Sequence, residues 1–269
     1  MMKKVIVITG IGGMGLAIAR RIGTGHKLVL ADFNGEKLEA AAESLNDAGY
    51  EVQTAELDIT NKKSVEQLAQ TAAELGAIHS VIHTAGISPT MSDPAHILNV
   101  NLIGTARIIE TFYKHISAGS VGIIIASMAG HMSTQYDSAL DRQQWSAQAD
   151  HLKLFIDSLE INERADAYSV SKKGNILQVQ ASAASWGEKG ARILSISPGI
   201  ISTPMGQQEK KEQPVLNYML QNGPVKRMGT PEDIAGTVEF LLSPQAGFIT
   251  GTDLLIDGGA ASFLKKIFI

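Results

Sequence analysis

The chain has 269 residues, of which 44% are hydrophobic and 19% are charged, and its formal net charge is −4. A chain of this size can bury a large core, and its slight negative charge argues against binding to nucleic acid or to an anionic membrane surface. The sequence contains no cysteine, which excludes disulfides, thiol catalysis and cysteine-ligated metals.

The N-terminal residues place two lysines before an apolar run, Val5 to Ile8, in an order that resembles a secretory signal peptide. Glycines at positions 10, 12 and 13 follow this run and would make a poor signal-peptide helix. We therefore predict a first strand at residues 3–9 and assign the protein to the cytoplasm.

Short β-branched runs then alternate with longer amphipathic segments. This rhythm predicts an α/β fold, with one Rossmann-type domain over residues 1–269 and a doubly wound parallel sheet covered by helices on both faces. Ligands bind at the carboxyl ends of the strands in such sheets. We expect further strands at residues 27–31, 51–56, 78–83, 121–127, 191–195 and 254–256, and helices at 35–48 and 62–75 among the connections.

The first strand leads into a glycine-rich turn with the spacing G-x-G-x-x-G at Gly10, Gly12 and Gly15. Glycine lets backbone amides approach a pyrophosphate at the N-terminus of the next helix. Asp32 ends the second strand about 20 residues later, the spacing expected for a carboxylate that binds the adenosine ribose. Because Asp32 would repel a 2′-phosphate and no arginine directly follows it, NAD(H) is favoured over NADP(H). The residues expected to contact the cofactor here are Gly10, Ile11, Gly12, Gly13, Met14, Gly15, Asp32 and Phe33.

Weaker signals follow the third and fourth strands. Asp58, which precedes Ile59, can reach an adenine amino group or can cap the helix that begins near residue 62, and the sequence leaves both possibilities open. Ala85 and Gly86 leave room for a ribose, although a plain turn explains this pair equally well.

Tyr168 and Lys172 are four residues apart, which places them side by side on one helix face. A cation beside a phenol favours the phenolate, so Lys172 is predicted to lower the pKa of Tyr168. A tyrosine tuned in this way can give or take a proton at an alcohol or carbonyl oxygen. The same spacing is common on solvated helix faces, so its context decides its meaning.

Further motifs stand at Asn101, Ser127, Pro198-Gly199, residues 227–235 and Asp257-Gly258-Gly259. Together with the motifs above, and in this order, they resemble the short-chain dehydrogenase/reductase family over nearly the whole chain. The resemblance implies that Tyr168 is the acid/base, and that Lys172 assists it and holds the nicotinamide ribose. It implies that Ser127 binds the substrate oxygen and that Asn101 holds a water that relays protons to Lys172. It also implies that the nicotinamide is bound by Pro198, Gly199, Ile201 and Thr203.

The chain departs from this family in three places. Its glycine loop is one residue shorter than in typical single-domain members, and His83 replaces a common asparagine, so His83 is expected to support the sheet instead. An insertion at about residues 131–165 carries an apolar stripe at helical spacing: Leu152, Phe155, Ile156 and Leu159. This stripe can pack on the body of the protein, form a protomer interface or wall the substrate site. The insertion resembles bacterial 3-alpha-hydroxysteroid dehydrogenase/carbonyl reductases.

These features predict an NAD(H)-dependent oxidoreductase that interconverts a secondary alcohol and a ketone. Residues 203–228 are expected to form a substrate lid, and their Met and Leu side chains favour an apolar, steroid-like or otherwise bulky substrate. A 3-oxoacyl-thioester reductase and a non-catalytic NAD-binding sensor are the alternatives. The resemblance further implies a homo-oligomer, a dimer or tetramer, and no metal site is predicted.

Overall fold

The predicted strands form one parallel sheet with the order β3-β2-β1-β4-β5-β6-β7. The computed structural model describes residues 3–132, 144, 148–158 and 160–268. The chain order reverses at β1 and β4, which lie next to each other at the centre of the sheet. The strands are β1 (Val5–Thr9), β2 (Lys27–Asp32), β3 (Glu51–Glu56), β4 (Ile78–His83), β5 (Val121–Ile125), β6 (Arg192–Pro198) and β7 (Asp253–Ile256).

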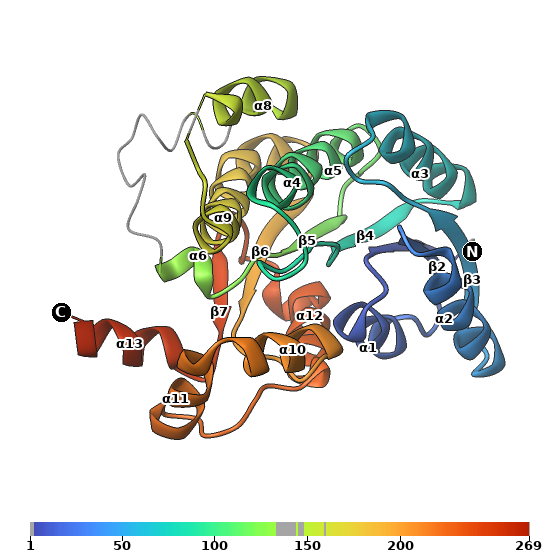
Figure 1. Cartoon of the computed structure of the whole chain (residues 1–269). Helices are drawn as coiled ribbons and strands as arrows, with labels where there is room; N and C mark the ends of the chain where they lie inside the picture. Colours follow the sequence, from blue (N-terminus) through green and yellow to red (C-terminus); the bar gives the residue numbers. More distant parts are fainter. Residues whose placement is uncertain (1–2, 133–143, 145–147, 159, 269) are drawn as a thin grey trace.

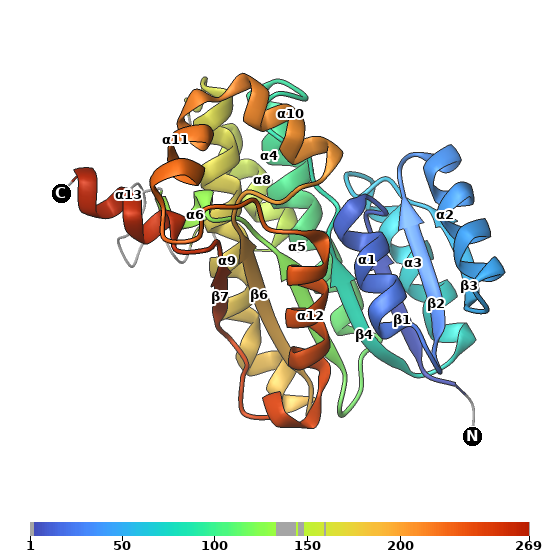
Figure 2. The same cartoon turned by 90° about the horizontal axis from the view of Figure 1, so that it is seen from below.

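Helices cover both faces of this sheet (Figures 1 and 2). In chain order, the helices of the first part of the sequence are α1 (Gly13–Ile22), α2 (Gly35–Asp47), α3 (Lys62–Leu75), α4 (Pro94–Leu98), a π-helix η1 (Asn99–Gly104), α5 (Thr105–Tyr113) and α6 (Ala129–Met132). Those of the second part are α8 (Ala149–Asp157), α9 (Arg164–Glu188), α10 (Pro204–Glu212), α11 (Pro214–Asn222), α12 (Pro231–Leu242), the short η2 (Pro244–Ala246) and α13 (Ala260–Phe268). Within the described residues, no helix is both long and apolar enough to span a bilayer.

Strand alternation explains the two layers of core. In β1, Ile6 and Ile8 face a cluster shared with α1, α2 and α12, whereas Val5 and Val7 face a cluster shared with α3 and α5. In Figure 1, α3, α5 and α9 accordingly lie above the sheet, and α1, α2 and α12 lie below it. The prediction of a first strand from the N-terminal apolar run is confirmed, and this strand is central.

The apolar stripe of the insertion packs on the body of the protein. Leu152 and Ile156 of α8 are buried, and Phe155 is partly buried, in a cluster with residues of α4, η1 and α9. Leu159 lies outside the described residues. Of the three arrangements open from the sequence, packing on the body is therefore confirmed for the described part of the stripe.

Candidate active site

The glycine-rich turn between β1 and α1 is closely packed against the ends of the neighbouring strands. The Gly10 N–H donates to Ala31 O at 2.7 Å, and the Gly10 carbonyl accepts from the Thr84 hydroxyl at 2.6 Å. Gly10 has a φ of 85°, and a Cβ there would lie 2.5 Å from Ala85 N. A Cβ on Gly15 would overlap the Gly10 carbonyl oxygen. Both positions therefore need glycine for the turn to close.

The start of α1, by contrast, is open. Gly12 is the N-cap, no side chain caps this helix, and a Cβ on Gly12 would meet no atom within 4 Å. Free N–H groups at the positive end of a helix dipole bind anions such as a pyrophosphate. The turn therefore fits a dinucleotide. Its other predicted members are Ile11, which is buried, and Gly13 and Met14, which are partly buried.

The Asp32 carboxylate lies beside this turn, as the sequence predicts. Its Oδ2 accepts from Ile11 N at 2.6 Å, and its Oδ1 accepts from Asn34 N at 2.9 Å. Each carboxylate oxygen can accept a second hydrogen bond, which suits a ribose with two hydroxyls. Phe33 follows with 80% of its surface exposed, so its ring is open to a ligand.

Asp58 follows β3, and its carboxylate closes a local turn. Its Oδ1 accepts from Thr60 N at 2.8 Å and from Thr60 Oγ1 at 2.6 Å. The side chain that caps α3 is Asn61, which accepts from two N–H groups of the first turn. The interpretation of Asp58 as a helix cap is therefore wrong, and its adenine contact stays a prediction. Ile59 is buried, with its side chain against Gly104.

Ser127 is held at the carboxyl end of β5 by the adjacent strand β6. The residues on either side of Ser127 continue the pairing after β5 ends: Ala126 N donates to Ile196 O at 2.7 Å, and Met128 N donates to Pro198 O at 2.9 Å. The strand predicted to reach Ser127 ends at Ile125, but these two hydrogen bonds still fix the Ser127 backbone.

Tyr168 and Lys172 lie on α9, and the Ser127 side chain lies close enough to the Tyr168 hydroxyl to lower its pKa. Lys172 Nζ lies 5.8 Å from the centre of the Tyr168 ring and donates to Ile125 O at 3.1 Å. Lys172 is only 6% exposed. A hydroxyl, a phenol and a buried ammonium therefore converge at the end of β5, where they can handle a proton and a developing oxyanion.

The electrostatics of Tyr168 differ from the prediction. Burial raises the pKa of Tyr168 well above 10, and the charge of Glu209 raises it further, whereas the hydrogen bond with Ser127 lowers it. Burial also lowers the pKa of Lys172, from 10.5 to about 8, although the charge of Glu209 opposes this change. The lowered pKa that the sequence analysis expected for Tyr168 is therefore wrong in direction, because burial is the largest cause and raises it.

Asn101 is fully buried in η1 and holds the segment that follows β4. Its Oδ1 accepts from Ile87 N at 2.9 Å, and its Nδ2 donates to Ile87 O at 2.9 Å. A Cβ on Gly86 would lie 3.1 Å from Asn101 Oδ1 and 3.5 Å from Lys172 Nζ. The Asn101 amide and the Lys172 ammonium thus both lie beside Gly86. Because the residue predicted there is glycine, no side chain crowds these two groups.

The segment after β6 returns to the glycine turn. A Cβ on Gly13 would lie 2.9 Å from Thr203 Cγ2, so the two predicted cofactor segments are adjacent. The Thr203 hydroxyl accepts from Gly206 N at 3.1 Å as the cap of α10 and retains its own proton for an acceptor. Upstream, a Cβ on Gly199 would lie 2.6 Å from the Asp257 Cα, and Pro198 and Ile201 are buried.

Comparisons with known proteins agree with this arrangement. A family model described as short chain dehydrogenase matches residues 3–139, and one described as Enoyl-(Acyl carrier protein) reductase matches residues 154–261. The chain is 38% identical to the short-chain dehydrogenase/reductase bsc3 of Alternaria brassicicola, over 99% of this chain and 98% of that protein. The chain belongs to the short-chain dehydrogenase/reductase family.

Two further relatives are functionally described by name. The chain is 29% identical to a 7alpha-hydroxysteroid dehydrogenase of Bacteroides fragilis, over 95% of this chain and 93% of that protein. The crystal structure of levodione reductase superposes with a TM-score of 0.78 at 28% identity, over 96% of this chain and 98% of that one. Both proteins are similar to this short-chain dehydrogenase/reductase over nearly their whole length.

The structure also brings to the site of this short-chain dehydrogenase/reductase a residue that the sequence analysis missed. Glu209 on α10 is partly buried, and its charge acts on both Tyr168 and Lys172. Burial raises the pKa of Glu209, and the Lys172 ammonium opposes that rise. No spacing along the chain connects Glu209 to α9, because only the folding of α10 over the site brings them together.

A second missed contact fixes α6, the helix that follows Ser127. His131 Nε2 lies 2.7 Å from Asp253 Oδ2, and Ser195 Oγ donates to Asp253 Oδ1 at 2.5 Å. A Cβ on Gly130 would lie 2.9 Å from the carbonyl carbon of Lys172, so α6 also lies directly on α9. These contacts join α6 to β6, β7 and α9. Among the residues that the structure describes, no three histidine or carboxylate side chains form a group that could hold a metal.

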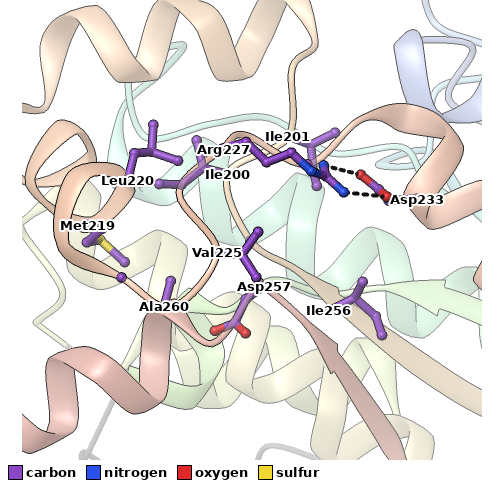
Figure 3. Close-up of a pocket in the computed structure, with 14 residues that line it drawn as sticks. Ile200, Ile201, Met219, Leu220, Val225, Arg227, Asp233, Ile256, Asp257 and Ala260 are labelled. Carbon is purple, nitrogen blue, oxygen red and sulfur yellow. Dashed lines mark hydrogen bonds and ion pairs between the residues drawn. The ribbon is translucent and has the colours of Figure 1, made fainter.

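A cavity of about 220 Å³ is lined in part by Gly199, Ile200 and Ile201, in the segment predicted to bind the nicotinamide (Figure 3). Apolar side chains from α11 and the end of β7 line it, and the paired Arg227 and Asp233 close one end, with Arg227 Nη1 2.7 Å from Asp233 Oδ2. Ser127, Tyr168 and Lys172 are not among its lining residues. The cavity therefore does not contain these three residues.

Proposed function

We propose that this protein is an NAD(H)-dependent oxidoreductase that interconverts a secondary alcohol and a ketone. The observation that carries this proposal is the convergence of Ser127 and Tyr168 with the buried Lys172 at the carboxyl end of β5, in a sheet whose first strand leads into a turn that fits a dinucleotide. Membership of the short-chain dehydrogenase/reductase family supports the same reaction class. A protein that only binds NAD as a sensor needs no such group of proton donors.

Different residues of the chain would bind different parts of the cofactor. The glycine turn and α1 would bind the pyrophosphate, Asp32 the adenosine ribose, Asp58 the adenine, and Lys172 the nicotinamide ribose. The nicotinamide supplies hydride transfer when bound. The carboxylate of Asp32 supports NAD(H) over NADP(H), because it would repel a 2′-phosphate. The remaining predicted contacts are Phe33, Ile59, Ala85, Gly86, Pro198, Gly199, Ile201 and Thr203.

Tyr168 then handles the proton at the substrate oxygen. Its raised pKa keeps the phenol protonated at neutral pH, so it can donate a proton to a ketone oxygen as that oxygen gains charge. The Ser127 hydroxyl binds the same oxygen and stabilises the developing alkoxide. Lys172 and Asn101, which meet beside Gly86, would return a proton to Tyr168 through water. In alcohol oxidation, the proton moves in the opposite direction.

The substrate that we favour is bulky and apolar, with a steroid-like alcohol or ketone as the leading class. The lid, residues 203–228, presents exposed apolar side chains at Met205, Val215 and Val225. The named 7alpha-hydroxysteroid dehydrogenase relative and the resemblance to 3-alpha-hydroxysteroid dehydrogenase/carbonyl reductases support this class. The Glu209 charge beside Tyr168 disfavours an anionic substrate at the same place.

A 3-oxoacyl thioester is the second candidate, since the family model over residues 154–261 carries an acyl-carrier-protein reductase description. A turnover assay separates the candidates: NADH or NADPH oxidation with bulky cyclic ketones, including steroid ketones, against 3-oxoacyl thioesters. The proposal expects turnover of cyclic ketones with NADH preferred. Cofactor binding without turnover of either class would favour the sensor. The predicted cytoplasmic location and homo-oligomeric state require fractionation and a solution mass measurement.

A further inference from the structure

A buried chain of hydrogen bonds runs from β1 through β4 to η1. His83 of β4 is 1% exposed, and its Nδ1 lies 2.6 Å from the Thr9 hydroxyl oxygen. On the other side of the ring, His83 Nε2 lies 3.0 Å from Thr105 Oγ1. The Thr105 hydroxyl in turn donates to Asn101 O at 2.7 Å. Side chains from two strands and one helix thus connect the centre of the sheet to Asn101.

Counting protons fixes the direction of every bond in this chain. A threonine hydroxyl has one proton, and that of Thr105 goes to Asn101 O, so Thr105 Oγ1 accepts from His83 Nε2–H. In the neutral ring, Nδ1 then has no proton and accepts from the Thr9 hydroxyl. Burial and the nearby Lys172 charge lower the pKa of His83 from 6.5 to about 3, so the ring stays neutral at physiological pH.

The Thr105 hydroxyl binds Asn101 at a break in regular helix geometry. The Thr105 N–H donates to Leu102 O, whereas Asn101 O accepts from the Thr105 side chain. Here a side-chain donor takes the place of a backbone donor, at the end of the π-helix η1. Short π-helices are frequent at functional sites. The backbone position of Asn101 therefore depends on where the Thr105 hydroxyl is held, and His83 Nε2–H holds it.

We propose that His83 is a positioning residue for the reaction: through Thr105 it fixes the Asn101 carbonyl, and so keeps the Asn101 amide beside Lys172. The inference rests on the proposed function, because it takes Asn101 and Lys172 as parts of the proton-handling group. It also gives His83 a directional role, since only the Nε2 side of the ring leads to Asn101. The Nδ1 side leads to Thr9, which supports the sheet.

Two isosteric variants test this asymmetry, because each removes one hydroxyl from the same buried chain. We expect Thr105→Val to lower kcat by about 10- to 100-fold, with little change in the KM for the cofactor, because Asn101 shifts relative to Lys172. Thr9→Val should keep kcat within about twofold of the wild type. It should nevertheless lower the thermal midpoint by about as much as Thr105→Val does, because each variant removes one buried hydrogen bond. Equal loss of kcat in both variants would overturn the proposal and leave His83 a plain structural support.

Substitutions of His83 itself give a second comparison. His83→Gln retains a donor near the Nε2 position and should keep most of kcat, whereas His83→Asn retains only a group near Nδ1 and should behave like Thr105→Val. The reverse order would contradict the proposal.

The tautomer provides a readout that needs no activity. Nitrogen NMR of the full-length wild-type protein should show His83 protonated at Nε2 and unprotonated at Nδ1 from pH 7 to pH 5. A proton on Nδ1 would overturn the inference. This result stands apart from the proposed function, whose own failure would appear as undiminished turnover in Tyr168→Phe.

Discussion

The two sides of the active site are built differently. The proposed cofactor side is formed by β1 to β4 with the glycine turn and Asp32, and close backbone contacts leave no room for a Cβ at Gly10 or Gly15. The substrate side, formed by α10 and α11, buries only Gly206, Leu216 and Met219. Sparse burial is typical of segments that open locally, and dense backbone packing is typical of those that do not. Under the proposed function, this difference means that the cofactor site is formed before binding and that the substrate face can adapt.

The strongest test of this contrast compares two glycines of the same turn. Gly15→Ala would place a methyl group on the Gly10 carbonyl, so the free energy of unfolding should fall by about 1–3 kcal/mol or more. Gly12→Ala has open space and should stay within about 0.5 kcal/mol of the wild type. The Gly12 methyl would nevertheless occupy the approach to α1, so the Kd for NADH should rise by at least about tenfold. Denaturant unfolding and NADH titration measure the two effects.

If both glycine variants lowered the free energy of unfolding equally, the contact between Gly15 and the Gly10 carbonyl would not make the turn rigid. If Gly12→Ala bound NADH as tightly as the wild type, the pyrophosphate would not lie over α1.

A smaller effect is expected from Asp32→Asn. Loss of the charge weakens the hydrogen bonds to the ribose, so NADH affinity should fall by about 10- to 100-fold while discrimination against NADPH decreases. Glu56→Gln is the matched control. Glu56 pairs with Asp32 in the β2–β3 register, so this substitution removes the same charge one strand away. Equal changes in both variants would show that only the general negative field matters.

On the substrate side, Glu209→Gln should change the pH profile and leave the fold intact. The Glu209 charge raises the pKa of Tyr168 and also that of Lys172, so its removal should lower both values. The alkaline rise of alcohol oxidation should therefore move to lower pH, a few-fold effect at a fixed pH near the midpoint. Glu66→Gln, which removes the same charge from the exposed face of α3, is the control and should leave the profile close to that of the wild type. An unchanged profile in Glu209→Gln would separate α10 from the reaction.

The smallest effect concerns the amino end of the cofactor side, far from the reacting groups. Burial, the stacked His26 ring and Lys4 lower the pKa of His79 from 6.5 to about 4. The unfolded chain therefore binds more protons than the folded chain between these values, and stability falls as the pH drops from 6.5 towards 4. His79→Phe should reduce the loss of thermal midpoint between pH 7 and pH 5. An identical loss in the variant would assign the acid sensitivity to other groups.

The sequence predicts the strands and the contact between Asp32 and the glycine turn well, because local rules determine them. The strand positions follow from β-branched runs between glycines and acids, and Asp32 reaches the glycine turn because adjacent parallel strands end together. The support expected from His83 is also confirmed by its bonds to Thr9 and Thr105.

The other features depend on contacts between distant segments. Glu209 reaches α9 only when α10 folds over the site, and His131 meets Asp253 from more than 100 positions away in the chain. The π-helix at Asn101 ends where the Thr105 hydroxyl donates to Asn101 O, a contact that no hydrophobic period reveals. The pKa of Tyr168 is raised mainly by burial, and burial cannot be read from a four-residue spacing.

The central claim is that the Tyr168 phenol transfers the proton during alcohol and ketone interconversion. The most direct measurement is kcat for Tyr168→Phe with the best ketone and NADH, together with NADH titration to verify the cofactor site. We predict that kcat falls by about 10²- to 10⁴-fold while the Kd for NADH stays within about twofold. A variant that turns over at the wild-type rate with the cofactor bound would contradict this account.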